Sequence, residues 1–197
     1  MTVLLVVSND HWGAQAEACV PPDADIVVAI DRSGGLSRSL RLVARRSIPV
    51  PAAARILLAQ RKLPRDRPRS RSSLASNADL QRLAQAHGAR DVLLFRAGLI
   101  ISGETLTRCD VRNIHCADIH GFGGLAAIWR ALQAHAFDQK ATLHRVTTRI
   151  DEGEVLDTEP FTLDPRLGYA ANEQLAYQAG LRLLARTLRR LQAPGTS

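Results

Sequence analysis

Aromatic residues, cysteines and long hydrophobic runs are all scarce in this sequence. Of the 197 residues, 46% are hydrophobic but 4% are aromatic, so the core must consist of Leu, Val, Ile and Ala, as is usual for helices packed on a parallel sheet. No stretch approaches the roughly 20 apolar residues that span a bilayer. The apolar N-terminus, Met1–Val7, lacks a basic leader and is too short for a signal peptide. We therefore expect a cytoplasmic protein without a membrane as a partner.

The three cysteines, Cys19, Cys109 and Cys116, are odd in number and lack the paired spacing of a zinc site or a disulfide framework. The sequence therefore predicts no metal site, and free thiols fit a reducing compartment. Cys116 could act as a nucleophile, but a small buried thiol is the more common role of a single cysteine.

Positive charge is concentrated in one basic insert, residues 32–71, which holds twelve Lys or Arg and one acid, Asp66. The insert contributes +11 to the formal net charge of +7, so the rest of the chain stands at −4. Such a segment can attract phosphates, nucleic acid or an acidic carrier protein. No aromatic residue interrupts the cluster from Arg61 to Arg71, which weakens the case for stacking on single-stranded bases. We interpret the insert as a solvated basic face with a loop, and nucleic acid is not an expected partner.

Short apolar runs alternate with helical patterns along the chain. Residues 3–7, 25–30 and 91–95 form nearly continuous apolar segments, which are typical of parallel strands covered on both faces. The predicted fold class is therefore α/β, a mostly parallel sheet flanked by helices. The length suits one domain, which we place at residues 1–192, with a frayed tail at 193–197.

Local signals place the helices between these strands. Helical spacing occurs within residues 36–43 and again within 53–60, with Pro49 and Pro51 between the two pieces. A loop is expected at residues 63–76.

The loop leads into a helix that Ser76 or Asn77 can cap and Gly88 can end. Asp91 then opens the third strand. Residues 169–191 carry a leucine-rich stripe and predict a long packing helix.

Two later segments carry polar residues suited to chemistry. Val111–His115 reads as a strand, whose alternation sends Asn113 and His115 to the same face. Residues 142–153 read as a second strand, a turn and the acid Asp151. A lone Asn-x-His is common by chance, so its weight comes from the surrounding order of motifs.

Five segments of the chain, spread over residues 91–191, occur in the order found in one enzyme family. With this set the chain resembles the folate-dependent formyltransferases, which act on glycinamide ribonucleotide, methionyl-tRNA or amino sugars. The separations of 31 residues from Asn113 to His144 and 38 from Asn113 to Asp151 fit that pattern without insertion or deletion. The segments are Ala97–Ile101, Asn113-Ile114-His115, Ile128–Leu132, Thr142-Leu143-His144 and Asp151-Glu152-Gly153.

The resemblance implies a Rossmann-like formyltransferase fold and 10-formyltetrahydrofolate as formyl donor. It assigns catalysis to Asn113, His115 and Asp151. It also implies that backbone groups hold the folate pterin, at Ala97 and Leu99 on one side and at Thr147, Thr148 and Asp151 on the other. The segment Ala97–Ile101 is expected to be a strand, and His144 is interpreted as a packing residue of its strand.

These residue types suit transfer of a formyl group to an amine. The attack creates a tetrahedral carbon with an oxyanion, to which Asn113 can donate a hydrogen bond. His115 can share this task and help the proton move. Asp151 can hold a water molecule or His115 in place, and its charge is expected to favour the imidazolium form of His115.

Two departures from the family pattern bear on the amine. The loop Cys116–Gly124 differs from the family's sequence, so Asp118 or His120 could recognise an unusual amine. The segment Ser8–Gln15 lacks the Gly-Ser-Asn phosphate turn, which argues against glycinamide ribonucleotide. The methionyl-tRNA enzymes carry a further C-terminal domain for which this sequence has no room. An amino sugar, a hydroxylated ornithine or a carrier-bound amino acid is the expected small-molecule or carrier-bound partner.

Three alternatives remain open at this stage. A folate hydrolase would use water in place of the amine. A non-catalytic protein of the same fold would explain the altered loop after His115. A nucleic-acid-binding module would rest on the basic insert, and its affinity would then fall steeply with salt.

Overall fold

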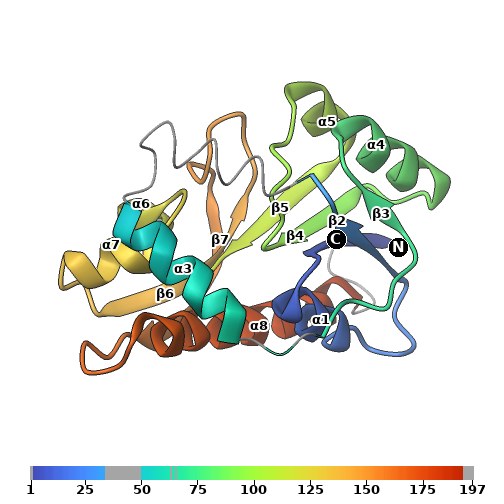
Figure 1. Cartoon of the computed structure of the whole chain (residues 1–197). Helices are drawn as coiled ribbons and strands as arrows, with labels where there is room; N and C mark the ends of the chain where they lie inside the picture. The colour runs from blue at the N-terminus through green and yellow to red at the C-terminus, as the bar shows by residue number, and fades with distance from the viewer. Residues whose placement is uncertain (1, 34–49, 63, 65, 193–197) are drawn as a thin grey trace.

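The computed structural model describes residues 2–33, 50–62, 64 and 66–192. Within them a seven-stranded sheet has the order β3-β2-β1-β4-β5-β6-β7 (Figure 1). Neighbours from β3 to β5 are parallel, whereas β6 is antiparallel to both β5 and β7. The mostly parallel α/β sheet predicted from the sequence is confirmed. The strands are β1 Val3–Ser8, β2 Ile26–Asp31, β3 Ser73–Leu74, β4 Asp91–Phe95, β5 Asp110–His115, β6 Asp138–Arg145 and β7 Val155–Thr162.

Helices cover both faces of the sheet. No helix in the described part of the chain is long and apolar enough to cross a membrane. The helices are α1 His11–Ala18, α3 Val50–Lys62, α4 Asn77–Ala86, α5 Gly103–Arg108, α6 Ile119–Phe122, α7 Ala127–Gln133 and α8 Tyr169–Gln192.

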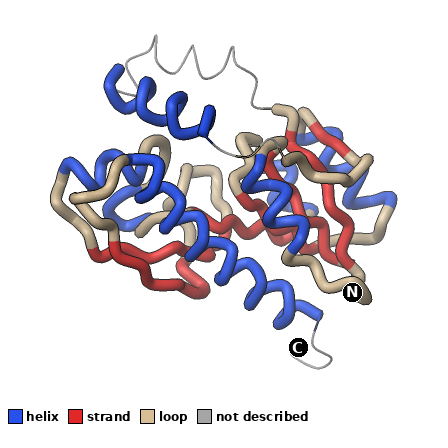
Figure 2. The backbone as a smooth tube through the Cα atoms, turned by 60° about the horizontal axis from the view of Figure 1, so that its bottom comes forward, coloured by secondary structure: helices blue, strands red, loops and turns tan. Residues whose placement is uncertain are grey.

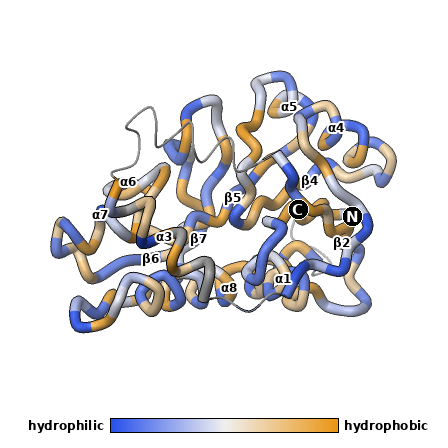
Figure 3. Tube along the Cα trace, in the orientation of Figure 1, coloured by the Kyte–Doolittle hydropathy of each residue, from blue (hydrophilic) through white to orange (hydrophobic). Residues whose placement is uncertain are grey.

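The apolar strands form two separate cores because successive side chains of a strand point to opposite faces. Leu4 and Val6 of β1 pack with buried residues of α4 on one face. Leu5 and Val7 pack on the other face, against α1 and α8. The trace around β1 and β4 is accordingly coloured mainly as hydrophobic, whereas many of the outer loops are coloured as hydrophilic (Figure 3). Continuous apolar runs are therefore required in strands that lie in the middle of the molecule.

Helix α4 begins and ends where the sequence predicts. The Ser76 side chain accepts a hydrogen bond from the Asp79 backbone and caps the N-terminus. Gly88 follows the helix with a φ of +62°, the left-handed conformation that glycine adopts without strain. Asp91 then opens β4, as expected.

Helix α8 crosses one face of the sheet, in front of the strands in Figure 2, and buries Leu183, Leu184 and Leu188 completely. Gly180 of this helix faces the end of β5. A Cβ atom at Gly180 would lie 2.5 Å from the sulfur of Cys116 and 3.2 Å from the Phe95 ring. The helix therefore needs glycine here to approach the sheet closely.

The basic insert supplies α3, so the helix predicted at residues 53–60 is confirmed. Ala59 of α3 is buried in a third apolar cluster, with Trp129 of α7 and Tyr169 and Ala176 of α8. The helix predicted within residues 36–43, the separating Pro49 and the expected frayed tail at 193–197 lie outside the described residues. The predicted loop at 63–76 contains the short strand β3, which adds to the sheet edge through Ile30 and Asp31 of β2.

Candidate active site

A cleft of about 1050 Å³ opens at the carboxyl ends of the parallel strands. Ser8, Asp31, Arg96 and Cys116, which end or follow β1, β2, β4 and β5, all line it. Ligands of open α/β sheets bind in this position, because the loops that leave adjacent strands diverge there. The predicted site residues Ala97, Leu99, Asn113, His115, Thr147, Thr148 and Asp151 also line this cleft.

The turn after β6 places Asp151 in the cleft wall. Gly153 packs directly on the β6 backbone, where a Cβ would lie 1.7 Å from the Arg145 carbonyl oxygen. Asp151 has a φ of +54°, a left-handed conformation that costs a non-glycine residue free energy. The side chain is 10% exposed. The Asp-x-Gly pattern is thus explained by a tight turn that presents a carboxylate.

Asn113 and His115 of β5 share a face, as the strand alternation predicts, and both reach Asp151. The Nδ1 atom of His115 lies 3.3 Å from Asp151 Oδ2. The Nδ2 atom of Asn113 lies 3.5 Å from Asp151 Oδ1, the outer limit of a hydrogen bond. The structure therefore brings the three predicted catalytic residues together at one point.

His144 joins this group, so its interpretation as a mere packing residue is wrong. The residue is paired with Asn113 across β5 and β6. Its Nε2 lies 3.3 Å from Asp151 Oδ1 and 3.2 Å from Asn113 Nδ2. Its Nδ1 lies 3.0 Å from the Arg145 carbonyl, which can only accept, so Nδ1 carries a proton. We call Asn113, His115, His144 and Asp151 the Asp151 cluster.

The Asp151 cluster holds its carboxylate in the ionised form. Burial raises the pKa of Asp151, but the contact with His144, the positive charge that His115 carries when protonated and the backbone N–H of Gly124 outweigh burial and lower the pKa to about 2. The Gly124 nitrogen donates to Oδ2 at 2.7 Å. A fixed negative charge therefore sits beside the two histidines.

His115 lies between two hydrogen-bond acceptors. Its Nε2 is 3.2 Å from the carbonyl oxygen of Phe122, opposite the Asp151 contact of Nδ1. Burial lowers the pKa of His115, and the opposing effects of Asp151 and Phe122 do not restore it. The charge of Asp151 does favour the imidazolium form, as expected, but desolvation outweighs this attraction and the net pKa is lowered. A neutral ring that gains a proton would find both of its N–H groups partnered.

The altered loop Cys116–Gly124 supports the Asp151 cluster through its backbone. Phe122 and Gly124 contribute the carbonyl and the N–H described above. Asp118 caps α6 and pairs with Lys140 at 3.4 Å. Neither Asp118 nor His120 lines the cleft, so the expectation that they recognise a substrate is not supported. Backbone contacts of this kind tolerate a change of side chain.

The segment Ala97–Ile101 lines the cleft but is not a strand. The backbone N–H groups of Gly98 and Leu99 donate to the Asp31 carboxylate instead of to a neighbouring strand. The prediction of a strand was wrong because the Asp31 carboxylate accepts these hydrogen bonds in place of a neighbouring strand.

The apolar rim of the cleft stands next to this segment. Ile100, Leu125 and Ile150 are 57%, 49% and 63% exposed and all line the opening. Together with Ala97–Ile101 and Val146–Asp151, they form what we call the Ile100 half of the cleft. Exposed apolar side chains gathered around an opening are typical of a binding site for a flat apolar group.

A second polar group, absent from the sequence-based predictions, occupies the other half of the cleft. Arg96 follows β4 with a φ of +54°. Its Nε donates to Asp10 Oδ2 at 2.7 Å, and its Nη1 donates to the Tyr177 hydroxyl. The guanidinium also lies 4.6 Å from the centre of the Tyr177 ring. Glu173, buried on α8, accepts a hydrogen bond from Tyr169 at 3.3 Å. We call Asp10, Arg96, Tyr169, Glu173 and Tyr177 the Arg96 cluster.

The Arg96 cluster holds two carboxyl groups, Asp10 and Glu173, but one cation, Arg96. Burial raises the pKa of Asp10, but Arg96 lowers it more, so this carboxylate is ionised. Burial lowers the pKa of Arg96, but Tyr177 and Asp10 hold it above its usual value. Burial raises the pKa of Glu173 in spite of Arg96 and Tyr169. Asp10 and Arg96 therefore neutralise one another, and Glu173 has no charged partner in direct contact among the described residues.

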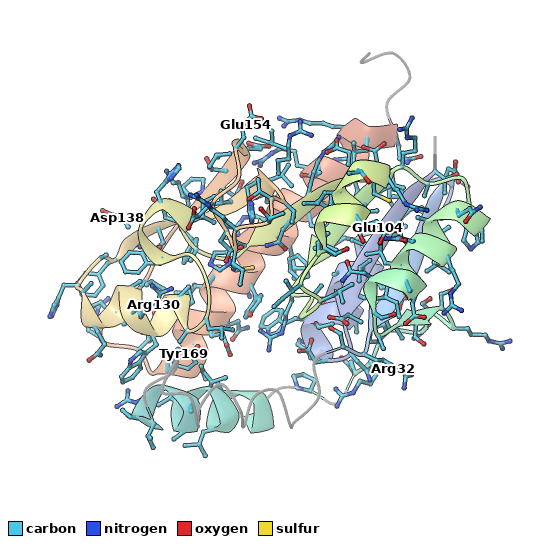
Figure 4. The ribbon with its side chains drawn as sticks, turned by 90° about the horizontal axis from the view of Figure 1, so that it is seen from above. Arg32, Glu104, Arg130, Asp138, Glu154 and Tyr169 are labelled. Carbon is cyan, nitrogen blue, oxygen red and sulfur yellow. The ribbon has the colours of Figure 1, made fainter. Side chains whose placement is uncertain are left out.

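The basic insert contributes to the same cleft. Ile56 of α3, Pro64 and Arg67 line it. In Figure 4, Tyr169 lies beside α3 and Arg32 lies beyond the opposite end of that helix. The described residues of the insert thus form part of the cleft wall. No group of three His, Cys, Asp or Glu side chains suited to a metal ion occurs among the described residues.

Comparison with known proteins shows which fold this is. No protein-family model matches the sequence, and no curated protein is significantly similar to it. Solved structures are similar over nearly the whole chain. A phosphoribosylglycinamide formyltransferase from Anaplasma phagocytophilum is 14% identical with a TM-score of 0.68, covering 98% of this chain and 87% of that one.

Two further structures agree. Glycinamide ribonucleotide transformylase 1 from Geobacillus kaustophilus is 20% identical with a TM-score of 0.65, covering 98% of this chain and 100% of that one. The sugar 3N-formyl transferase WlaRD, solved with dTDP and 5-N-formyl-THF, is 13% identical with a TM-score of 0.63, covering 97% of this chain and 63% of that one. The chain has the fold of these formyltransferases, as the sequence motifs predicted.

Proposed function

We propose that the protein is an enzyme that transfers a formyl group from 10-formyltetrahydrofolate to an amine. The observation that carries this proposal is the Asp151 cluster. In the wall of a large cleft, the ionised carboxylate of Asp151 lies within 3.5 Å of two histidines and an amide. The fold and the neighbouring formyltransferase structures support the same activity.

The Ile100 half of the cleft is proposed to hold the folate. The apolar side chains of Ile100, Leu125 and Ile150 suit the aromatic part of the donor. The pterin would contact the backbone of Ala97 and Leu99 on one side and of Thr147, Thr148 and Asp151 on the other. The hydrogen bonds from Gly98 and Leu99 to Asp31 support this role, because they fix the loop without a strand.

The reaction forms a bond between the amine nitrogen and the formyl carbon and breaks the bond from that carbon to N10 of the folate. One proton leaves the amine and one reaches N10. Asn113 donates to the oxyanion of the tetrahedral intermediate. The Asn113 amide has a hydrogen available for this bond, because its contact with Asp151, at 3.5 Å, is only a weak hydrogen bond.

His115 is proposed to accept the amine proton as the base. Its lowered pKa keeps the ring neutral at neutral pH, as a base requires. For Nε2 of His115 to react, the substrate must displace the Phe122 carbonyl oxygen, which lies 3.2 Å from this nitrogen. Asp151 then stabilises the imidazolium from the other ring nitrogen. His144 and Gly124 hold Asp151 in position.

The amine is proposed to be a specialised small molecule or a carrier-bound group. The start of α1 supports this, since Asp10 itself caps the helix by accepting from the Gly13 nitrogen at 3.1 Å. A phosphate at that position would meet a carboxylate where other helix starts offer free N–H groups. The three cysteines are free, which supports a cytoplasmic location.

The proposal is tested by a thermal-shift titration with 5-formyltetrahydrofolate, followed by assay of tetrahydrofolate release from the 10-formyl donor. A ligand that binds the folded state raises the melting temperature by mass action. We expect a saturable shift and amine-dependent release. Release of formate without an amine would instead identify a hydrolase. No shift at saturating ligand would overturn the proposal.

A further inference from the structure

We propose that the amine substrate is a diamino acid, whose α-ammonium binds Glu173 and whose α-carboxylate binds Arg96 while its distal amine is formylated. This inference rests on the proposed function and names its substrate class.

Glu173 offers a free oxygen to the cleft. The residue is 5% exposed and lines the cleft from α8. Its Oε1 accepts from Tyr169, whereas Oε2 makes no hydrogen bond within the described parts of the chain. A buried carboxylate is stable as an ion only with a compensating charge, and burial accordingly raises the pKa of Glu173. An ammonium group would supply the missing charge and a hydrogen bond.

Arg96 offers a free hydrogen-bond donor to the same cleft. Its Nε and Nη1 are engaged by Asp10 and Tyr177, but its Nη2 makes no hydrogen bond to any residue that the structure describes. The side chain is 14% exposed and lines the cleft. A planar guanidinium with a free edge is suited to a carboxylate.

Arg96 and Glu173 lie in the same part of the cleft. Arg96 donates to Tyr177, and Glu173 lies one helical turn before Tyr177 on α8. No ion pair joins them in the described structure, so neither side chain satisfies the other. Complementary groups held apart in this way fit a molecule that carries both charges on one carbon, as an α-amino acid does.

The charge balance disfavours a phosphorylated amine at this position. Asp10 already neutralises Arg96, so a phosphate bound to Arg96 would bring two negative charges next to Glu173. The head group of an amino acid, with one ammonium and one carboxylate, adds no net charge at this position.

The position relative to the Asp151 cluster requires the second amine to be distal. Cys116 lines the same cleft as Arg96 and Glu173, and its sulfur packs against Gly180, two helical turns after Glu173 on α8. Cys116 directly follows His115. A head group at Arg96 and Glu173 would therefore send a side chain of a few methylenes toward His115.

The test compares kcat/KM for a set of amines with 10-formyltetrahydrofolate as donor. Ornithine, lysine and 2,4-diaminobutyrate carry both charged groups. The diamine 1,4-diaminobutane lacks the carboxylate, 5-aminopentanoate lacks the α-ammonium, and glucosamine 6-phosphate is a phosphorylated amino sugar. We expect the best diamino acid to exceed each of the other three by about tenfold or more, as loss of one charged hydrogen bond predicts.

The variant Glu173→Gln separates recognition from folding, because glutamine can still accept from Tyr169. We expect a roughly tenfold rise in KM for the diamino acid with little change in kcat, and no change for 5-aminopentanoate. Glu104→Gln, an exposed carboxylate on α5 outside the cleft, is the matched control and should behave as the wild type. If Glu173→Gln does not fold, the amine series on the wild type decides alone.

Equal turnover of the diamino acid and its truncated analogues, or better turnover of the amino-sugar phosphate, would overturn the inference while the formyltransferase activity stands. Unchanged discrimination in Glu173→Gln would do the same. Absence of folate binding and of turnover with every amine would instead overturn the proposed function itself.

Discussion

The two polar clusters in the cleft differ in how the chain builds them. The Asp151 cluster comes from two adjacent strands and the turn that follows, so its members are fixed by sheet register. The Arg96 cluster takes three residues from α8, Arg96 from just after β4 and Asp10 from the cap of α1. One cluster is part of the framework, and the other is assembled from loops and a helix face.

This difference separates reaction from recognition. Strand pairing holds reacting groups to a narrow geometry, as catalysis requires. The residues of the Arg96 cluster lie outside the strands, so they can be replaced without disturbing the sheet. We therefore expect changes in the Asp151 cluster to reduce kcat and changes in the Arg96 cluster to alter the KM of the amine.

Replacement of His115 by Asn should have the largest effect. Loss of a general base predicts a decrease in kcat/KM of about 10³-fold. In the wild type, kcat/KM should fall as the pH decreases through a midpoint below 6.5, because burial lowers the pKa of His115 from that value. The variant should lack this acidic limb. His120→Asn, outside the cleft, is the control, and a retained limb in His115→Asn would rule out its role as the base.

Replacement of Asn113 by Ala should lower kcat by about 10²-fold, because it removes one donor to the oxyanion. The dissociation constant of 5-formyltetrahydrofolate, measured by titration, should change little. A loss confined to folate binding would instead place Asn113 in recognition and contradict the division between the two clusters.

The contribution of Asp151 to stability should depend on pH. Its folded-state pKa of about 2 lies below the ordinary 3.8, so its contribution is complete above 3.8 and is lost as the pH falls through about 2. The shift corresponds to roughly 2 kcal/mol. Denaturant unfolding of the wild type and Asp151→Asn at pH 7 and pH 2 should show their difference in free energy changing by this amount. An unchanged difference would show that the carboxylate is not stabilised by its partners.

Removal of the Tyr177 hydroxyl should have the smallest effect. Tyr177→Phe deletes one hydrogen bond to Arg96 and keeps the ring under the guanidinium, so we expect a loss of about 1 kcal/mol in unfolding free energy. The KM of the amine should rise a few-fold while folate binding stays constant. A decrease in kcat as large as that of Asn113→Ala would show that the clusters act as one.

The sequence predicted the framework because its signals are local. The apolar runs of β1, β2 and β4, the Ser76 cap and the stripe of α8 each depend on neighbours within a few residues. Strand alternation placed Asn113 and His115 on one face, and the resemblance to the formyltransferases implied that Asp151 acts with them.

The Arg96 cluster could not be predicted, because its contacts join residues as much as 86 positions apart and no periodic pattern marks them. His144 was misjudged for a related reason. A polar residue in a buried strand faces either the core or a site, and the alternation of β6 alone does not tell which. Its register opposite Asn113 would have resolved this, and register was not available from the sequence.

The contact of Gly180 with Cys116 has a consequence for how the protein is made. The seven strands in the described residues all precede residue 163, so a growing chain contains this sheet before α8 is synthesised. Yet α8 supplies Glu173 and Tyr177, and through Gly180 it packs against the residue beside His115. A nascent chain should therefore acquire this sheet early and the described cleft only when α8 leaves the ribosome and docks.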